Sequence, residues 1–298
     1  MSGATSRIDA GDLAAIARLR IVPQRFYGRW VATVLILAVL VWLGLAFAKG
    51  DIAWPVVAQF FTAPAILSGL VNTLIMTVCA MTLGIVLGVV FAIMYMSPNP
   101  VLRGVALFYI WFFRGTPLLL QLLIWFNLAL VFPTIGIPGV MSWRTIDLIG
   151  PFMATLLGLG MNQGAYTAEV VRGGILSVDT GQTEAAKAIG MTRLTTLRRI
   201  VLPQAMRVII PPVGNEVISM VKLTSVASVI QYAEILRNAQ TIYYANARVI
   251  ELLIVAAGWY LLVVTVLQIG QYFPERHFSK GRGTRRANKR AAAQEEPA

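Results

Sequence analysis

Two charged residues, Glu216 and Lys222, stand inside an apolar run that extends over about 208–230. A charge within the hydrocarbon layer of a membrane is costly, so such residues face a bundle interior or a cavity and serve something polar. At about 100° per residue, their six-residue offset places them on different faces of a helix, which argues against a direct pair. With the neighbouring Asn215 they offer an acid, a base and an amide. Glu216 and Lys222 can therefore line a cavity. The alternative is that they form a deep structural bridge to another helix.

A second pair of charges, Glu169 and Arg172, lies near the end of an apolar run over about 148–171. A spacing of three residues puts both side chains on one helix face, where they can form an ion pair. Their place at the cytoplasmic end of the run favours a structural pair over a solute contact. The sequence Pro211-Pro212-Val213-Gly214 also permits a break in the helix of Glu216, and exposed backbone ends at a break can bind charged groups.

The chain offers little for enzyme chemistry. It contains one cysteine, Cys79, and one histidine, His277. A single cysteine excludes an internal disulfide and a cysteine-based metal site, and one histidine leaves no nucleophile–base constellation to build. The sequence has no Gly-Lys dipeptide and therefore no phosphate-binding loop of the GxxxxGK[ST] type. We expect no catalytic residues, no metal and no ATPase motif in this chain.

The composition is that of a polytopic membrane protein, because 57% of the 298 residues are hydrophobic and only 13% are charged. The net charge of +12 comes from basic residues at the N-terminus, in the 170–207 segment and in the tail. These clusters lack the aromatic interleaving of nucleic-acid grooves. Cationic flanks that face anionic membrane lipid explain the charge, and no nucleic-acid partner is predicted.

Six apolar stretches are long enough to span a bilayer, which needs about 20 residues per helix. They cover about 30–48, 66–96, 105–132, 148–171, 208–230 and 252–272. Threading the chain with its N-terminus inside places about twenty basic residues in the cytoplasm and four on the opposite side. This asymmetry predicts an all-α membrane helix bundle with six spans and both termini in the cytoplasm.

The two ends of the chain carry their own predictions. Residues 1–29 form a basic cytoplasmic leader, and 276–298 form a basic tail that we expect to be disordered. The Ala46-Phe47-Ala48 sequence after the first apolar run is similar to a signal peptidase site. The leader is long for a signal peptide and the run is long enough to span, so we favour a retained helix over 30–48.

Residues 184–203 are polar and basic and separate two apolar segments, so they form a structured loop in water. Glu184-Ala185-Ala186 begins a run of strong helix formers, and Thr183 is available as its cap. Gly190 suits a left-handed C-cap, and Thr192 can start a second helix that runs to Leu202 before Pro203. A helix–Gly–helix loop of this kind is a docking element for a cytoplasmic partner.

The spacing of this loop resembles the coupling-loop signature of permease subunits of binding-protein-dependent ABC importers. The matching residues are Glu184, Ala185, Ala186, Gly190, Ile200, Leu202 and Pro203. The segment 113–121, FRGTPLLLQ, is similar to the signature of the polar amino-acid branch, and 164–175 is similar to its AY-x-AE-x-x-RGGI motif. Asn215-Glu216 followed by Lys222-x-Thr-Ser resembles a third motif, with departures at Leu223 and Val226. The resemblance covers about 65–275.

The resemblance implies a permease of the type I fold in a bacterial cytoplasmic membrane, with a five-helix core and an extra N-terminal helix. Its implied partners are ATPase subunits that bind ATP–Mg, a second permease subunit, identical or homologous, and an extracytoplasmic amino-acid-binding protein. The loop over 180–204 would contact the ATPase, and this chain would bind no cofactor. ATP-driven closure of the ATPases would then give alternating access.

The resemblance also assigns candidate roles. An amino acid carries a carboxylate and an ammonium group, and the residues expected along its path are Gln121, Tyr166, Asn215, Glu216 and Lys222. Gating or structural roles are expected for Arg114, Pro117, Glu169 and Arg172. The alternatives are a permease of the same fold for an opine or cystine, an autonomous secondary transporter, and a membrane-embedded enzyme.

Overall fold

The computed structural model describes residues 27–137 and 141–279, with side chains as far as 272. The chain forms two compact units, of which the first ends at Ile52 and contains helix α2 (Tyr27–Lys49). Every side chain of α2 is exposed within the structure. This helix coincides with the predicted first span, whereas the leader over 1–26 lies outside the described residues.

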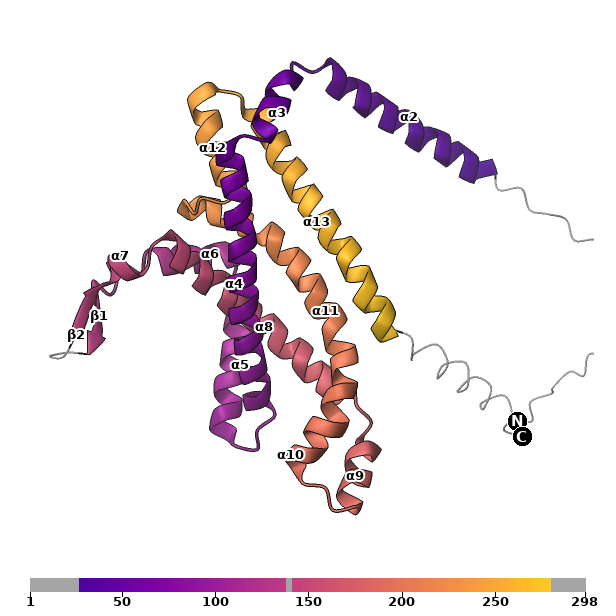
Figure 1. Ribbon diagram of the computed structural model, residues 1–298, viewed down its shortest axis with the longest axis vertical. Helices are drawn as coiled ribbons and strands as arrows, with labels where there is room; N and C mark the ends of the chain where they lie inside the picture. Colours follow the sequence, from indigo (N-terminus) through magenta and orange to yellow (C-terminus); the bar gives the residue numbers. More distant parts are fainter. Residues whose placement is uncertain (1–26, 138–140, 280–298) are drawn as a thin grey trace, which may run out of the picture. The chain divides into compact units, whose positions relative to one another are not determined.

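The second unit, which starts at Ala53, is almost entirely helical and holds the candidate site (Figure 1). Its longer helices are α3 (Trp54–Phe61), α4 (Pro64–Tyr95), α5 (Pro100–Gly115), α6 (Leu118–Phe126), α8 (Pro151–Leu176), α9 (Thr180–Ala188), α11 (Leu202–Leu223), α12 (Ile235–Asn246) and α13 (Val249–Ser279). Its short helical pieces are η1 (Leu128–Leu130), α7 (Thr145–Leu148), α10 (Arg193–Thr196), η2 (Leu197–Val201) and η3 (Thr224–Ile230).

Four helices among the described residues are long and apolar enough to cross a membrane. They are Tyr27–Lys49, Pro64–Tyr95, Arg193–Ile230 and Val249–Tyr272, and the bent pair α5–α6 makes a fifth if it is one span. The predicted count of six is reached only by adding α8. This helix of 26 residues has the length, but its glycines and polar residues lower its hydropathy.

Helices α4 and α8 form the centre of the bundle. A side chain at Gly84 of α4 would put its Cβ 2.5 Å from Cγ of Gln163, so only glycine permits this approach. A buried apolar cluster continues from this seam to α6 and α11, and it includes Met76, Leu122, Leu159 and Met220. The close packing fixes the polar residues of α8 against α11.

The predicted third span over 105–132 is wrong as a single helix. Helix α5 ends at Gly115, α6 begins at Leu118, and the two are bent by 103°. A residue before proline is disfavoured in the helical region, and Thr116 is accordingly extended, with φ −108° and ψ 144°. Pro117 thus lies between two helices, as the cap residue before α6.

The break that Pro211-Pro212 would permit does not occur, because both prolines lie inside the continuous helix α11. Proline removes backbone bonds from a helix but has a helix-compatible φ. Burial of Ile209 with Val171 of α8 holds α11 across this point. The winding changes later, after Leu223, where the 3₁₀ segment η3 begins.

Two further features were not predicted. Strands β1 (Thr134–Ile137) and β2 (Met141–Arg144) pair antiparallel, with Thr134 opposite Arg144, between η1 and α7. Helices α3 and α12 lie outside the predicted spans. Helix α13 continues to Ser279, into the 276–298 range expected to be disordered, and the rest of that range lies outside the described residues.

Candidate functional site

Glu216 is held between α11 and α8 by hydrogen bonds. Its Oε2 accepts from Nε2 of Gln163 at 2.7 Å and from Oγ1 of Thr167 at 3.1 Å. Nε2 of Gln163 also donates to Oγ1 of Thr167 at 3.0 Å. Among the described residues this half-buried carboxylate has no ion-pair partner. It is a negative charge that two uncharged side chains orient between helices.

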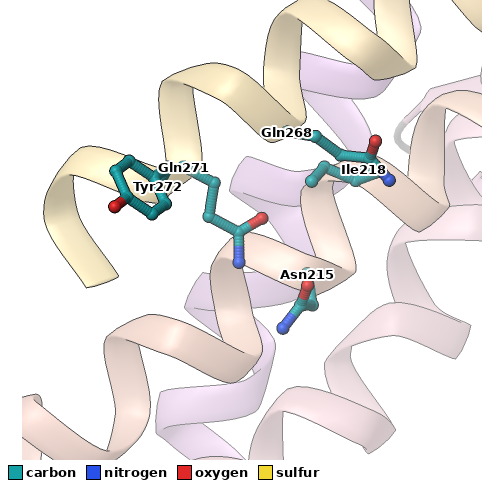
Figure 2. A pocket seen from close by; sticks show the side chains of 5 residues that line it. All are labelled: Asn215, Ile218, Gln268, Gln271 and Tyr272. Carbon is teal, nitrogen blue, oxygen red and sulfur yellow. The ribbon is translucent and has the colours of Figure 1, made fainter. Parts of the chain in front are cut away.

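The other two members of the predicted trio point elsewhere. Lys222 is exposed, and its offset from Glu216 leaves the two unpaired, as the six-residue spacing predicts. Asn215 lines a small cavity between α11 and α13 (Figure 2). The acid therefore stands on one face of α11, whereas the amide and the base, which are seven residues apart, share another face.

The cavity beside Asn215 has a volume of about 170 Å³ and is lined by amides. Gln268 and Gln271 of α13 face it together with Ile218 and Tyr272, and Nε2 of Gln271 donates to the carbonyl of Pro211 at 3.3 Å. Sequence reasoning missed the two glutamines. Their spacing of three within an apolar run, which places them on one helix face, was the available signal.

Gln121 is buried at the bend between α5 and α6. Its Nε2 donates to the carbonyl of Phe113 at 3.0 Å and to Oγ1 of Thr116 at 2.8 Å. Asn162 of α8 donates to the same Phe113 carbonyl at 2.8 Å and to Oε1 of Gln121 at 3.3 Å. Carbonyls at a helix end need such partners. Gln121 and Asn162, the latter missed in the sequence, therefore brace the bend.

Of the predicted gating or structural residues, Arg114 and Arg172 contact aromatic rings on other helices, and Glu169 pairs with Arg172 within α8. The guanidinium carbon of Arg114 lies 5.2 Å from the ring centroid of Tyr166, whose side chain is partly exposed. Nη2 of Arg172 lies 2.7 Å from Oε2 of Glu169, so the i,i+3 ion pair is present. Arg172 also lies over the ring of Tyr95, at 5.0 Å. These pairs tie α5 and α4 to α8.

The loop after α8 has the helix–Gly–helix form that its sequence indicates. Gly190 has φ +78°, a conformation that side chains resist, and its N–H donates to the carbonyl of Lys187 at 3.0 Å. Thr192 starts the second helix, where its Oγ1 accepts from the N–H of Thr195. The predicted cap Thr183 is wrong, because Asp179 caps α9 from four residues earlier through the N–H of Gly181.

The second helix does not stop before Pro203 as predicted. Instead α10, the π-helical turn η2, α11 and η3 run on as one rod, Arg193–Ile230, of 38 residues. The N–H of Leu202 bonds the carbonyl of Leu197, five residues back, and Nε2 of Gln204 donates to the carbonyl of Ile200. The wider turn accommodates a proline that lacks an N–H.

The rod joins the two candidate regions directly. Ile200, Leu202 and Pro203 of the loop signature lie at its start, and Glu216 and Lys222 lie further along the same helix. Helix α9, with exposed Glu184 and Ala185 and buried Ala186, contacts α10 and η2. A displacement of the loop can therefore pass along a helix to the half-buried carboxylate of Glu216.

Comparison with known proteins gives consistent matches. Residues 84–280 match the family described as binding-protein-dependent transport system inner membrane component. The arginine transport system permease protein ArgU of Corynebacterium glutamicum is 42% identical over 265 residues, covering 87% of this chain and 83% of the relative. The L-cystine transport system permease protein TcyB of Bacillus subtilis is 39% identical over 230 residues, covering 77% and 92%.

Solved structures show the same fold. A crystal structure of an amino acid ABC transporter with histidines matches with a TM-score of 0.65 and 36% identity, over 74% of this chain and 97% of that chain. The MetNI methionine ABC transporter in an inward-facing form matches with a TM-score of 0.58 at 18% identity, over 72% and 96%, which supports the fold alone.

Proposed function

We infer the function from family membership, because the chain belongs to the binding-protein-dependent transport system inner membrane components. It is the membrane-spanning permease subunit of an amino-acid ABC importer. We propose in addition that a polar or charged amino acid is its substrate. The observation that carries this proposal is the 42% identity to an arginine system permease over most of both chains.

The proposed assembly follows from the same membership. ATPase subunits would bind ATP–Mg and dock on α9, a second permease subunit would complete the path, and an extracytoplasmic binding protein would deliver the solute. The complex would lie in the bacterial cytoplasmic membrane with the α9 loop inside. ATP-driven movement of α9 would pull the start of the rod Arg193–Ile230, which carries Glu216. This chain would supply the substrate path and the helix that transmits the movement, and the ATPase would supply the energy.

The proposed substrate contacts use separate faces of α11. The carboxylate of Glu216 is oriented by Gln163 and Thr167 and suits an ammonium or guanidinium group. The amides beside Asn215, together with exposed Lys222, suit a carboxylate. Tyr166 offers a partly exposed aromatic ring that contacts Arg114, whereas Gln121 already bonds the carbonyl of Phe113 at the bend. An opine or cystine is the runner-up substrate class, favoured by the identity to the cystine permease.

The test is uptake by the purified complex in lipid vesicles, with the ATPase and binding-protein subunits that co-purify with this chain. Labelled arginine, histidine, glutamine, glutamate and cystine are compared with and without ATP. We expect ATP-dependent uptake of a polar or charged amino acid. Uptake that proceeds without the ATPase but follows an ion gradient would contradict the proposal and favour a secondary transporter.

A further inference from the structure

Glu234 is a fully buried carboxylate between the end of the rod and α12. Its Oε1 accepts from the N–H of Arg237 at 2.6 Å and its Oε2 accepts from the N–H of Leu236 at 2.8 Å. Glu234 thereby caps α12, whose first N–H groups have no partner inside the helix. Acidic residues are almost never fully buried unless paired. Burial at this cap therefore indicates a further contact.

That contact is Tyr260 of α13, whose hydroxyl donates to Oε2 of Glu234. The same hydroxyl lies beside the hydroxyl groups of Thr73 in α4 and Thr224 at the start of η3. Thr73 also accepts from the N–H of Ile235 at 3.3 Å. The surrounding seam is apolar and includes the buried residues Ile66, Ile235, Ala239, Leu252, Val255 and Ala256. The Glu234–Tyr260 pair is thus a polar tie between four elements in an apolar seam.

The tie meets the rod where its winding changes. Thr224 comes two residues after Lys222 and begins the seven-residue 3₁₀ segment η3. Runs of this kind longer than three or four residues are uncommon, so tertiary contacts must hold η3 in this form. Gln231, with φ +64°, then turns the chain toward Glu234. The Glu234–Tyr260 tie therefore contacts η3 at its start, through Thr224, and Glu234 follows its end after the turn at Gln231.

We propose that Glu234 and Tyr260 are positioning residues for transport. They hold the far end of the rod in its 3₁₀ form against α4 and α13, and in this way they set the place of Lys222. Loss of the tie releases the first turn of α12 and the end of the rod together. The inference rests on the proposed function only for its link to transport, because the tie itself can be measured without any substrate.

The tie is sensitive to pH. Glu234 lies between the candidate spans, and burial raises its pKa from 4.5 to about 6, although its hydrogen bonds lower the pKa in part. Among the described residues, the titratable groups that face it are Tyr260 of α13 and Tyr232 after η3. Arg237 of α12 contributes its backbone N–H, while its guanidinium donates to Oε1 of Gln231. From α4 the groups beside it are uncharged, namely the hydroxyl of Thr73 and the amide of Asn72.

The sign follows from linkage. A carboxyl whose pKa is raised on burial binds its proton more tightly in the closed arrangement, so acid favours closure and this gain is lost as pH rises through 6. With pKa values of about 6 closed and 4.5 open, the open population is about eightfold greater at pH 7.5 than at pH 5.

Hydrogen exchange, followed by mass spectrometry over 232–238, tests the proposal in the complete complex in lipid nanodiscs without ATP. Rates at pH 5 and pH 7.5 are corrected for the intrinsic pH dependence of exchange. We expect the eightfold ratio in the wild type and a ratio near one in Glu234→Gln. In Tyr260→Phe, exchange at pH 7.5 should rise about tenfold and ATP-driven uptake should fall at least about fivefold at normal abundance.

Tyr232→Phe is the matched control, because it removes a phenol that bonds the carbonyl of Asn72 at 3.0 Å and leaves the tie intact. It should keep the wild-type pH ratio. A wild-type ratio near one, or an eightfold ratio that persists in Glu234→Gln, overturns the proposal. Unchanged hydrogen exchange and unchanged uptake in Tyr260→Phe would also overturn the proposal. This second variant provides the test if Glu234→Gln does not assemble into the complex. Absence of amino-acid uptake in the wild type would instead refute the proposed function.

Discussion

The α9 loop, which precedes the rod Arg193–Ile230, and the Glu216 site within the rod are stabilised in opposite ways. The α9 loop is exposed and is shaped by caps and turns within a few residues, namely Asp179, Gly190 and Thr192. Further along, Glu216 is held by Gln163 and Thr167, which come from about 50 positions earlier in the chain. The first region is local and self-contained, whereas the second depends on packing between helices.

This difference bears on how the molecule works. A locally stabilised loop can be displaced as a unit by a partner without loss of its shape. A site built across α8 and α11 must change when the helix that carries it moves, because its hydrogen bonds join two elements. The rod connects a part that keeps its form to a part that rearranges, as a coupling device requires.

The largest expected effect is in the loop. Gly190→Pro replaces φ +78° with a ring that fixes φ near −65°, so the turn between α9 and α10 cannot form. We expect normal membrane insertion, weak ATPase association and no uptake. Glu184→Lys, an exposed charge reversal on α9, should act in the same direction. Gly173→Ala, at an exposed helical glycine with free space around it, is the control. Wild-type uptake by Gly190→Pro would remove the loop from the coupling path.

The next effect is at the site between helices. Glu216→Gln keeps the shape of the side chain but removes its charge, and a hydrogen bond to a charged group contributes about 1.5–3 kcal/mol. We expect uptake per folded complex to fall at least about tenfold, with altered selectivity among amino acids. Lys222→Met should act similarly, and Lys222→Arg should retain most activity. If uptake falls only in proportion to the amount of folded complex, the role of Glu216 and Lys222 is structural.

A smaller effect is expected at the bend. Gln121→Leu removes the donor to the carbonyl of Phe113 and to Thr116, although Asn162 still bonds that carbonyl. Leaving a buried polar group unsatisfied costs about 1–3 kcal/mol. The thermal midpoint of the complex should fall, with substrate selectivity unchanged. A change in selectivity at wild-type stability would return Gln121 to the substrate path.

Sequence rules worked best where structure is local. The left-handed Gly190 and the cap Thr192 follow from residue type and spacing, and so does the Glu169–Arg172 pair. Prolines were harder to read. Pro117 breaks a helix that was expected to be continuous, whereas Pro211 lies in a continuous helix at a point where the sequence permits a break. Packing against neighbouring helices decides whether a proline breaks its helix. A single sequence does not show which helices pack together.

The partners of Glu216 could not be predicted for the same reason. Gln163 and Thr167 lie on one face of α8 at a spacing of four, but nothing local indicates that this face meets α11. The contact depends on the close approach of α4 and α8 at Gly84, which sets α8 in place. The hairpin β1–β2 and the cap Glu234 were also missed, although their bonds are local: Thr134 pairs with Arg144, and Glu234 accepts from the N–H groups two and three residues ahead.

The central claim is that the rod moves as a rigid unit and so carries a displacement of the α9 loop to the half-buried Glu216. Spin labels at Leu194 and Val229, both exposed, would measure the rod itself by pulsed electron resonance in a Cys79→Ser background. A helix of this length predicts a separation of about 50 Å. We expect this distance to stay the same when ADP and vanadate are trapped in the ATPase after hydrolysis, while a label pair at Val229 and Ile93 of α4 changes its distance. A Leu194–Val229 distance that shifts or broadens by several ångströms would contradict the account.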